Sequence, residues 1–421
     1  MTLIRPLDLT GSSQFGEVRT LKGSGKVPAI LGFAIFVSSF GFAIPLPQSF
    51  YLQAVLCPMI IAAAYVLTIR DQQLGSLRIE PALALMCTWS VMSLGWTLAG
   101  TRSGVTTMML LVAVILTSFL GSNLVDPQAL LRWLASAMAV MLALTLVHAV
   151  VAPGAAFSAA VGEVEGSGLR GLFAAKNTLG QTLIYAAALR VVIKPGRLRL
   201  IANVILPILL VLCNNSGAII AATCVVGAQI VAGWAATERA RGSRGGLFVL
   251  GGFLSFAIVA VALGRNVLYG LVGRGADLTG RDVIWKYTFL QAQKKPWIGY
   301  GAGGFWKYGG GPAEFVRRSS KWAVTSAHEG WLDTMVEYGL VGVFLVLCVV
   351  IATITRIVKR LRLGDRGLIT LVSVGVVVGL IMGSLSESTL VFPGLAMLAL
   401  VNGLMFNDPL RRPDQATSSL S

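Results

Sequence analysis

The hydrophobic residues of this chain fall into stretches of about 14 to 20 residues, separated by polar connections, along most of its 421 positions. A helix needs roughly 20 consecutive apolar residues to cross a bilayer, so stretches of this length predict transmembrane helices. Twelve candidate spans follow: residues 28–45, 50–69, 81–99, 104–121, 133–152, 178–193, 200–213, 217–235, 246–264, 336–355, 367–385 and 389–406. The pattern therefore predicts an all-α polytopic integral membrane protein, one membrane domain of about twelve helices.

The composition supports this prediction. The chain is 55% hydrophobic and 12% charged, whereas a soluble domain carries roughly a quarter charged residues. All the cysteines fall inside apolar stretches, without metal-ligand or disulfide spacing, and are interpreted as small buried hydrophobic residues. The apolar stretch after the first 26 residues lacks a small-residue cleavage site, which argues against a removed signal peptide.

The distribution of positive charge predicts the orientation. If both termini are cytoplasmic, 21 of the 34 Lys and Arg residues lie in segments that face the cytoplasm. The short outer turns near residues 45–49, 214–216 and 386–388 contain none, as the positive-inside rule requires. The net charge of +16 is thus mainly a topology signal, and a nucleic-acid partner is not expected. The predicted location is the bacterial cytoplasmic (inner) membrane, multi-pass, with residues 1–27 and 407–421 as cytoplasmic tails.

Two longer outer segments, residues 153–177 and 265–330, contain most of the other basic residues. The second is a large external loop, expected to contain short amphipathic helices, with ten basic and four acidic residues. Loops of this length are exempt from the charge rule, so the excess needs another explanation. A basic concavity suits an anionic ligand such as a lipid-linked phosphate or pyrophosphate. Attraction to lipid headgroups is the alternative.

His328 is the only histidine outside the predicted spans. Ser326 and Glu329 form an S-x-x-E capping box, which predicts that a helix starts at Ser326 and presents the imidazole in its first turn. A free imidazole titrates near pH 6.5, so its neutral form can accept a proton from a sugar hydroxyl as a general base. A surface histidine without a role is the alternative. The other histidine, His148, lies in an apolar span, where a neutral, hydrogen-bonded packing role is expected.

Arg281 is the candidate phosphate ligand of the large loop. Thr279 can cap a helix with Asp282 three residues on, which places the guanidinium beside free backbone N–H groups. A fork of donors at a helix N-terminus is suited to bind phosphate. An ion pair with Asp277 or Asp282 is the alternative.

Arg170, Lys176 and Asn177 stand at the end of the first outer segment, just before a predicted span. A basic pair and an amide at this position can line a headgroup site. They can equally be interfacial anchors that reach the phosphates of bulk lipid.

Aromatic residues crowd the large loop, with five of the nine tryptophans between residues 265 and 331. Aromatic rings stack on sugar faces, but they also form the belt at a membrane interface. The candidates for sugar binding are Trp285, Tyr300, Trp306 and Trp331. Residues 299–304 match the letters of a dinucleotide fingerprint, but outside any βαβ unit, so this match is excluded. No metal-ligand motif occurs in an outer segment, so neither a metal nor a cofactor is expected.

Taken together, four segments resemble the O-antigen ligase and Wzy-type polymerase superfamily, and most closely its ExoQ-like exopolysaccharide polymerases. These segments are Gly171-Leu-Phe-Ala-Ala-Lys-Asn-Thr-Leu-Gly180, Gly280-Arg-Asp-Val-Ile-Trp285, Pro296-Trp-Ile-Gly-Tyr-Gly-Ala-Gly-Gly-Phe-Trp306 and His328-Glu-Gly-Trp-Leu-Asp-Thr-Met-Val-Glu-Tyr-Gly-Leu-Val-Gly342. Their order and the twelve-span frame cover nearly the whole chain.

The resemblance implies a metal-independent, inverting glycosyltransferase whose donor is a polyprenyl-pyrophosphate-linked glycan and whose acceptor is another glycan. It also implies that Arg170 and Arg281 contact the pyrophosphate and that His328 assists the acceptor hydroxyl. Membrane lipids and other polysaccharide export components are the further partners considered. Glu329 departs from the asparagine common in relatives. Two alternatives stay open: ligation of the glycan to a lipid A core or another terminal acceptor, and transport of the lipid-linked sugar.

Overall fold

The computed structural model describes residues 79–119, 127–157, 168–173, 175–194, 196–243, 245–253, 255–256, 281–307, 309–391 and 393–407. Within these ranges the chain is helical and contains no β-strand, which confirms the predicted all-α class. The helices are α3 (Pro81–Met92), α4 (Thr101–Phe119), α5 (Pro127–Val151), α6 (Pro153–Ala156), α7 (Lys176–Leu189), α8 (Arg197–Cys213), α9 (Ser216–Ala240), α11 (Arg281–Ala292), α12 (Ala313–Ser320), α13 (Gly330–Arg362), α14 (Leu368–Ser384) and α15 (Gly394–Asn407). Residues 245–253 are also helical.

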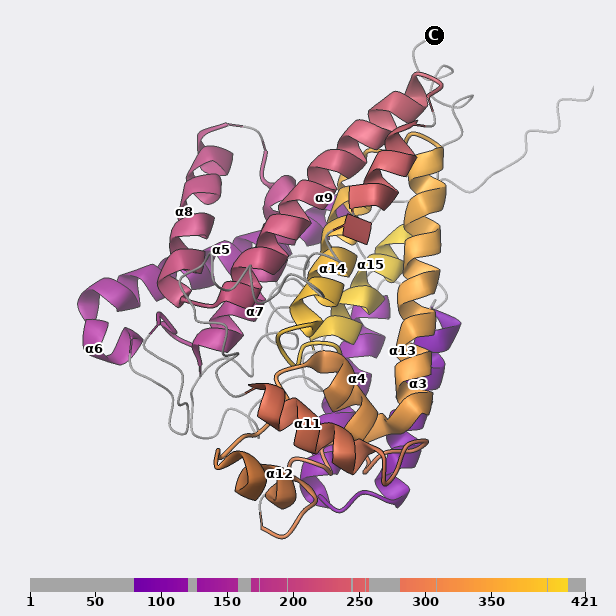
Figure 1. Cartoon of the computed structure of the whole chain (residues 1–421). Coiled ribbons are helices and arrows are strands. Elements are labelled where there is room, and N and C mark those ends of the chain that lie inside the picture. The colour runs from indigo at the N-terminus through magenta and orange to yellow at the C-terminus, as the bar shows by residue number, and fades with distance from the viewer. Residues whose placement is uncertain are drawn as a thin grey trace, which may run out of the picture.

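Ten of the twelve predicted spans overlap helices of the structure, while those at residues 28–45 and 50–69 lie outside the described residues. Three described helices are long and apolar enough to cross a membrane: Gln128–Val151, Ser216–Ala240 and Gly330–Arg362. The number twelve stays a prediction. Figure 1 shows α11 and α12 together at one end of the helix bundle, which we call the loop end.

The central helix of the bundle is α14, which packs against α7, α9, α13 and α15. It is apolar on all sides and almost entirely buried, as expected of a helix surrounded by other helices. Gly375, Gly379 and Gly383 follow at intervals of four residues. A Cβ atom at Gly379 would lie 2.8 Å from Cγ2 of Ile184 in α7, so the glycines let the neighbouring backbones approach closely.

The long helix α13 is kinked at Gly339, which has a φ of 68° and a ψ of −170°. At the kink the glycine-rich segment 296–301 lies against the helix backbone. Four backbone hydrogen bonds of 2.8 to 3.2 Å join the two: Leu340 N to Pro296 O, Val341 N to Trp297 O, Tyr300 N to Val336 O and Gly301 N to Glu337 O. The loop therefore pairs with groups that the helix cannot satisfy at its kink.

The same pairing explains the glycines of the excluded fingerprint. Gly299 and Gly301 have φ values of 64° and 85°, which suit glycine. A Cβ atom at Gly299 would lie 2.6 Å from the carbonyl carbon of Glu337. These glycines thus permit close contact with α13 rather than with a nucleotide.

The large loop has its own hydrophobic core beneath α11 and α12. Ile284, Tyr300, Phe305, Trp306 and Val316 are buried in it. Two short helices lie in this loop, as predicted. The core holds the loop as a cap on the bundle, and it gives the N-termini of α11 and α13 fixed positions.

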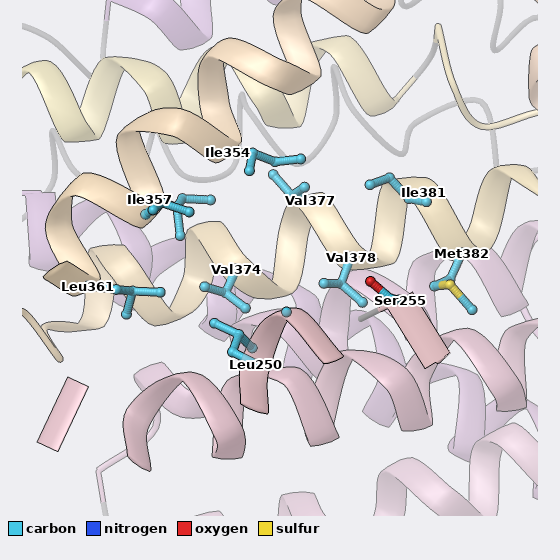
Figure 2. A pocket seen from close by; sticks show the side chains of 12 residues that line it. Leu250, Ser255, Ile354, Ile357, Leu361, Val374, Val377, Val378, Ile381 and Met382 are labelled. Atoms are coloured by element: carbon cyan, nitrogen blue, oxygen red, sulfur yellow. The ribbon is translucent and has the colours of Figure 1, made fainter. Parts of the chain in front are cut away.

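An apolar cavity of about 310 Å³ lies between α13, α14 and a neighbouring segment that contributes Leu250, Gly251 and Ser255. Figure 2 shows Ile357, Val374, Val378 and Met382 directed toward it. Ser255 contributes the one hydroxyl among its lining residues. Its lining matches the apolar character of the surrounding helices.

Candidate functional site

Four helices begin at the same place at the loop end. Asn177 lies in the first turn of α7, Asn215 caps α9, Arg281 is the first residue of α11, and Glu329 caps α13. A helix N-terminus carries unpaired N–H groups and a partial positive charge, so several together favour an anion. In this structure the carboxylate of Glu387 contacts Asn215 at the start of α9, Arg281 and His328.

Glu387 lies in the turn between α14 and α15, with 4% of its side chain exposed. Its Oε1 atom lies 3.2 Å from Nδ2 of Asn215 and 3.4 Å from Nη2 of Arg281. Its Oε2 atom lies 3.4 Å from Nδ1 of His328. One carboxylate therefore joins α9, α11 and the residue before α13.

Arg281 pairs with the carboxylate of Glu387 in the turn between α14 and α15. Its Nη1 atom donates to the carbonyl oxygen of Ser386 at 2.7 Å, and its side chain is 11% exposed. The predicted cap Thr279 and the alternative partner Asp277 lie outside the described residues. The α14–α15 turn thus holds the guanidinium, and the predicted helix start at Thr279 stays a prediction because it lies outside the described residues.

His328 does not lie in the first turn of a helix, and that prediction was wrong. The helix begins at Gly330, and Glu329 caps it by accepting from the amide of Leu332. His328 has a φ of 52°, which a helix does not allow, and its amide donates to Oγ of Ser326 at 3.4 Å. Its ring stacks on Trp322, with 6.2 Å between centroids. Strained backbone of this kind is common at functional sites.

Asn177 joins the cluster through Asn215, whose Nδ2 atom donates to Oδ1 of Asn177 at 3.0 Å. Lys176, the first residue of α7, is buried, and its carbonyl oxygen accepts from Sγ of Cys213 at 2.9 Å. The first outer segment therefore reaches the Arg281–His328 cluster through Asn177. Whether either side chain binds a headgroup stays a prediction.

Arg170 lies beside the short helix α6. Its Nε atom donates to the carbonyl oxygen of Ala155 at 3.2 Å, and its amide donates to that of Ala156 at 2.9 Å. These contacts fix the backbone of the first outer segment on the end of α5. Its predicted contact with pyrophosphate stays a prediction.

The aromatic candidates fall into two groups. Tyr300 and Trp306 are buried in the loop core, where Nε1 of Trp306 donates to Oδ1 of Asp333 at 2.7 Å. Trp285 and Trp331 are half-buried, and Nε1 of Trp285 donates to the carbonyl oxygen of Ala327 at 2.8 Å. Trp285 and Trp306 thus support the segment on either side of His328, through Ala327 and Asp333. Sugar binding by these rings stays a prediction.

Three residues of the cluster were not predicted from sequence: Glu387, Asn215 and Trp322. Glu387 carries the clearest signal, because it is an ionisable residue in a turn of only three residues between two predicted spans. Asn215 also leaves a sign, since it precedes an apolar stretch as a helix cap would. Trp322 is not distinguished in the sequence from the other loop tryptophans.

Glu329 is a second acid close to His328. Burial raises the pKa of Glu329 to about 7, and its hydrogen bond from the amide of Leu332 opposes that rise. The side chain can therefore change its protonation state near neutral pH. Within the described ranges no group of three His, Cys, Asp or Glu residues is placed to hold a metal. Metal independence stays a prediction.

Gly217 keeps the α14–α15 turn in place. A Cβ atom at this position in α9 would lie 2.2 Å from Oγ and 2.7 Å from Cβ of Ser386. We expect Gly217→Ala to displace the turn that holds Arg281 and Glu387, and to lower activity about a hundred-fold, as ångström-scale misplacement can. The measurement is a steady-state assay, with purified protein, of the glycan extension that the resemblance implies.

Two variants control this prediction. Gly233→Ala, in the same helix with its nearest neighbour 3.8 Å away, should be close to wild type. Adding Ser386→Gly to Gly217→Ala should restore activity, since it removes the clashing side chain and keeps the carbonyl that Arg281 uses. No loss in the single variant would show that the turn tolerates the displacement.

Comparison with known proteins confirms the predicted resemblance. Residues 201–347 match the family model described as O-antigen ligase. The matched range includes Asn215, Arg281 and His328, and it ends before Glu387. Arg170, Lys176 and Asn177 precede it.

A curated relative is the exopolysaccharide production protein ExoQ of Rhizobium meliloti (strain 1021). It is 29% identical to this chain over 133 residues, which cover 30% of this chain and 30% of ExoQ. The chain is thus similar over part of its length to the O-antigen ligase and Wzy-type superfamily, including its ExoQ-like members. Its described residues form helices and no β-strand, and three of these helices are long and apolar enough to cross a membrane.

Proposed function

We propose that this protein is a glycosyltransferase that polymerises polyprenyl-pyrophosphate-linked oligosaccharide repeats into a surface polysaccharide. The reaction takes place at the outer face of the bacterial cytoplasmic membrane, with the loop end outside. The observation that carries the proposal is the placement of Arg281 and His328 on one buried carboxylate, among four helix N-termini. The similarity to the exopolysaccharide production protein ExoQ supports a role in making exopolysaccharide, and the family model described as O-antigen ligase keeps ligation as the alternative.

In the proposed reaction, a hydroxyl of the acceptor glycan attacks the anomeric carbon of the donor sugar. Nε2 of His328 takes the hydroxyl proton, because Nδ1 is directed to Glu387 and leaves Nε2 for the substrate. The bond between the anomeric carbon and the phosphate oxygen breaks, and its electron pair leaves with polyprenyl pyrophosphate. Attack opposite the leaving group inverts the anomeric configuration.

Arg281 would bind the pyrophosphate in this scheme. A guanidinium donates two parallel hydrogen bonds to a phosphate, and the helix N-termini around it add positive potential. Both effects stabilise the charge that develops on the leaving group, so the mechanism assigns this role to arginine rather than to a metal.

The decisive experiment supplies purified protein in detergent with polyprenyl-linked oligosaccharide extracted from host cells that lack this gene. A ladder of longer lipid-linked glycans supports a polymerase. A single transfer that needs an added lipid A core or another terminal acceptor identifies a ligase instead. No extension in detergent, with movement of the substrate across a vesicle bilayer, would overturn the enzyme proposal in favour of a transporter.

Arg281→Ala should lower the rate at limiting donor roughly ten- to a hundred-fold, because it removes a charge-assisted contact. Arg281→Lys should lose less, since it keeps the charge and loses only the fork. Rates measured at limiting and at saturating donor separate binding from turnover. Equal rates for wild type and Arg281→Ala at limiting donor would exclude Arg281 as the donor ligand.

A further inference from the structure

Glu387 presents an unusual charge arrangement. Its side chain is 4% exposed, and a buried carboxylate is costly unless cations and hydrogen-bond donors surround it. Arg281 and Asn215 supply these donors to Oε1, and His328 contacts Oε2. The carboxylate therefore uses the same groups that the proposed reaction needs for the donor and the acceptor.

Both terminal nitrogens of Arg281 are engaged while it holds the α14–α15 turn. Its two terminal nitrogens contact the carbonyl oxygen of Ser386 and the carboxylate of Glu387, at 2.7 and 3.4 Å. A pyrophosphate that binds the guanidinium fork has to take over the longer, weaker of these contacts. The carboxylate then keeps Asn215 and His328 as neighbours.

We propose that Glu387 is a positioning residue that occupies the donor's anion site until pyrophosphate arrives and then acts on His328. This inference rests on the proposed function, because it assigns the donor to Arg281 and the base to His328. It adds a link between them: loading of the donor prepares the base.

The physical reason for the link is electrostatic. With Arg281 paired to Glu387, the guanidinium offsets the carboxylate's negative charge and its attraction for a proton on His328. When pyrophosphate takes the guanidinium, the carboxylate attracts that proton more strongly, at a site of low dielectric where the effect is large. His328 then accepts the proton of the acceptor hydroxyl at Nε2 and shares its Nδ1 proton with Glu387. The imidazolium later releases the proton to water.

Other groups also act on His328. Glu329 is its neighbour in the chain, and Asp333 in the first turn of α13 interacts with it electrostatically. Asp333 already accepts hydrogen bonds from Trp306, Ala327 and Ser388, so its contacts are directed to the loop. Glu329 titrates near neutral pH and needs its own control.

The test uses Glu387→Gln, which keeps the shape and loses the charge. We expect turnover at saturating donor to fall roughly ten- to a hundred-fold, because the base becomes weaker. The acid side of the pH–rate profile should move to lower pH, because the variant has no negative charge 3.4 Å from Nδ1 of His328. Inorganic pyrophosphate, measured by calorimetry, should bind several-fold more tightly, because Arg281 loses its competitor.

If Glu387 has this positioning role, turnover falls while pyrophosphate binds more tightly. If its role is only structural, turnover, pyrophosphate affinity and thermal stability all fall together. Glu387→Asp should restore the acid side of the profile in part, and it serves if Glu387→Gln does not fold. Glu329→Gln, a control that keeps the helix cap, should leave pyrophosphate affinity unchanged. Weaker pyrophosphate binding in Glu387→Gln, or an unmoved pH profile, would overturn the inference. The proposed function would stand as long as the wild type extends glycans.

An inactive wild type would overturn the proposed function instead. The pyrophosphate measurement would then still decide whether Glu387 competes for Arg281.

Discussion

His328→Ala is expected to lower glycan extension by a factor of about a hundred to ten thousand, the usual effect of removing a positioned general base. The fold should survive, because His328 precedes α13 and its side chain is 20% exposed. Thermal unfolding of the purified variant should therefore resemble wild type. His328→Gln, which is polar but cannot take the proton, should be equally inactive.

The backbone at His328 allows a sharper version of this test. Its φ of 52° suits glycine, so His328→Gly should fold without added strain and leave a space where the ring was. Added imidazole should then restore part of the activity. Lys321→Gly is the matched control, because Lys321 has a similar φ of 56° and caps the end of α12. Near wild-type extension by His328→Gly without imidazole would remove His328 from the mechanism.

The sequence was informative where the signal is local. Arg281 and His328 were selected from their positions beside predicted helix starts. In the structure His328 precedes α13, which begins at Gly330, whereas the residues before Arg281 lie outside the described ranges. The capping box failed because Ser326 binds the amide of His328 while Glu329 turns to Leu332, so the helix begins four residues later than predicted. Both patterns use the same residue types, and only backbone geometry distinguishes them.

Contacts between distant segments could not be read from the sequence. Glu387 lies 106 residues from Arg281 and 59 from His328 along the chain, and nothing local connects them. The turn at residues 386–388 was considered only for its lack of basic residues. His148 shows a related error: a hydrogen-bonded role was predicted, yet within the described residues its Nδ1 atom is buried without a partner.

The glycine-rich segment 299–304 shows how a motif can be excluded correctly and still not be explained. Its glycines are required by the backbone of α13, which approaches at the Gly339 kink. The kink itself left no sequence signal, since one glycine in a long apolar span costs a helix only about 1 kcal/mol relative to alanine. The pairing of segment 296–301 with α13 can be seen only in the folded structure.

Gly339→Ala is therefore expected to destabilise the protein far more than an ordinary glycine substitution. A Cβ atom there would lie 2.2 Å from the carbonyl oxygen of Trp297 and 2.3 Å from its carbon, which are backbone atoms that cannot rotate away. The combination of a φ of 68° and a ψ of −170° is essentially restricted to glycine, and it adds roughly 1–3 kcal/mol for any residue with a Cβ. Loss of the four hydrogen bonds to segment 296–301 adds about 0.5–1.5 kcal/mol each.

The measurement is thermal unfolding in detergent, together with size-exclusion chromatography. Gly104→Ala in α4 is the control, because a Cβ atom there meets nothing within 4 Å, and it should be neutral or slightly stabilising. Since segment 296–301 carries the loop core that supports α11, Gly339→Ala should also impair pyrophosphate binding by Arg281, even at temperatures where the protein stays folded. Gly339→Ala with wild-type stability would mean that α13 can straighten without the loop, and that the kink does not hold the large loop on the bundle.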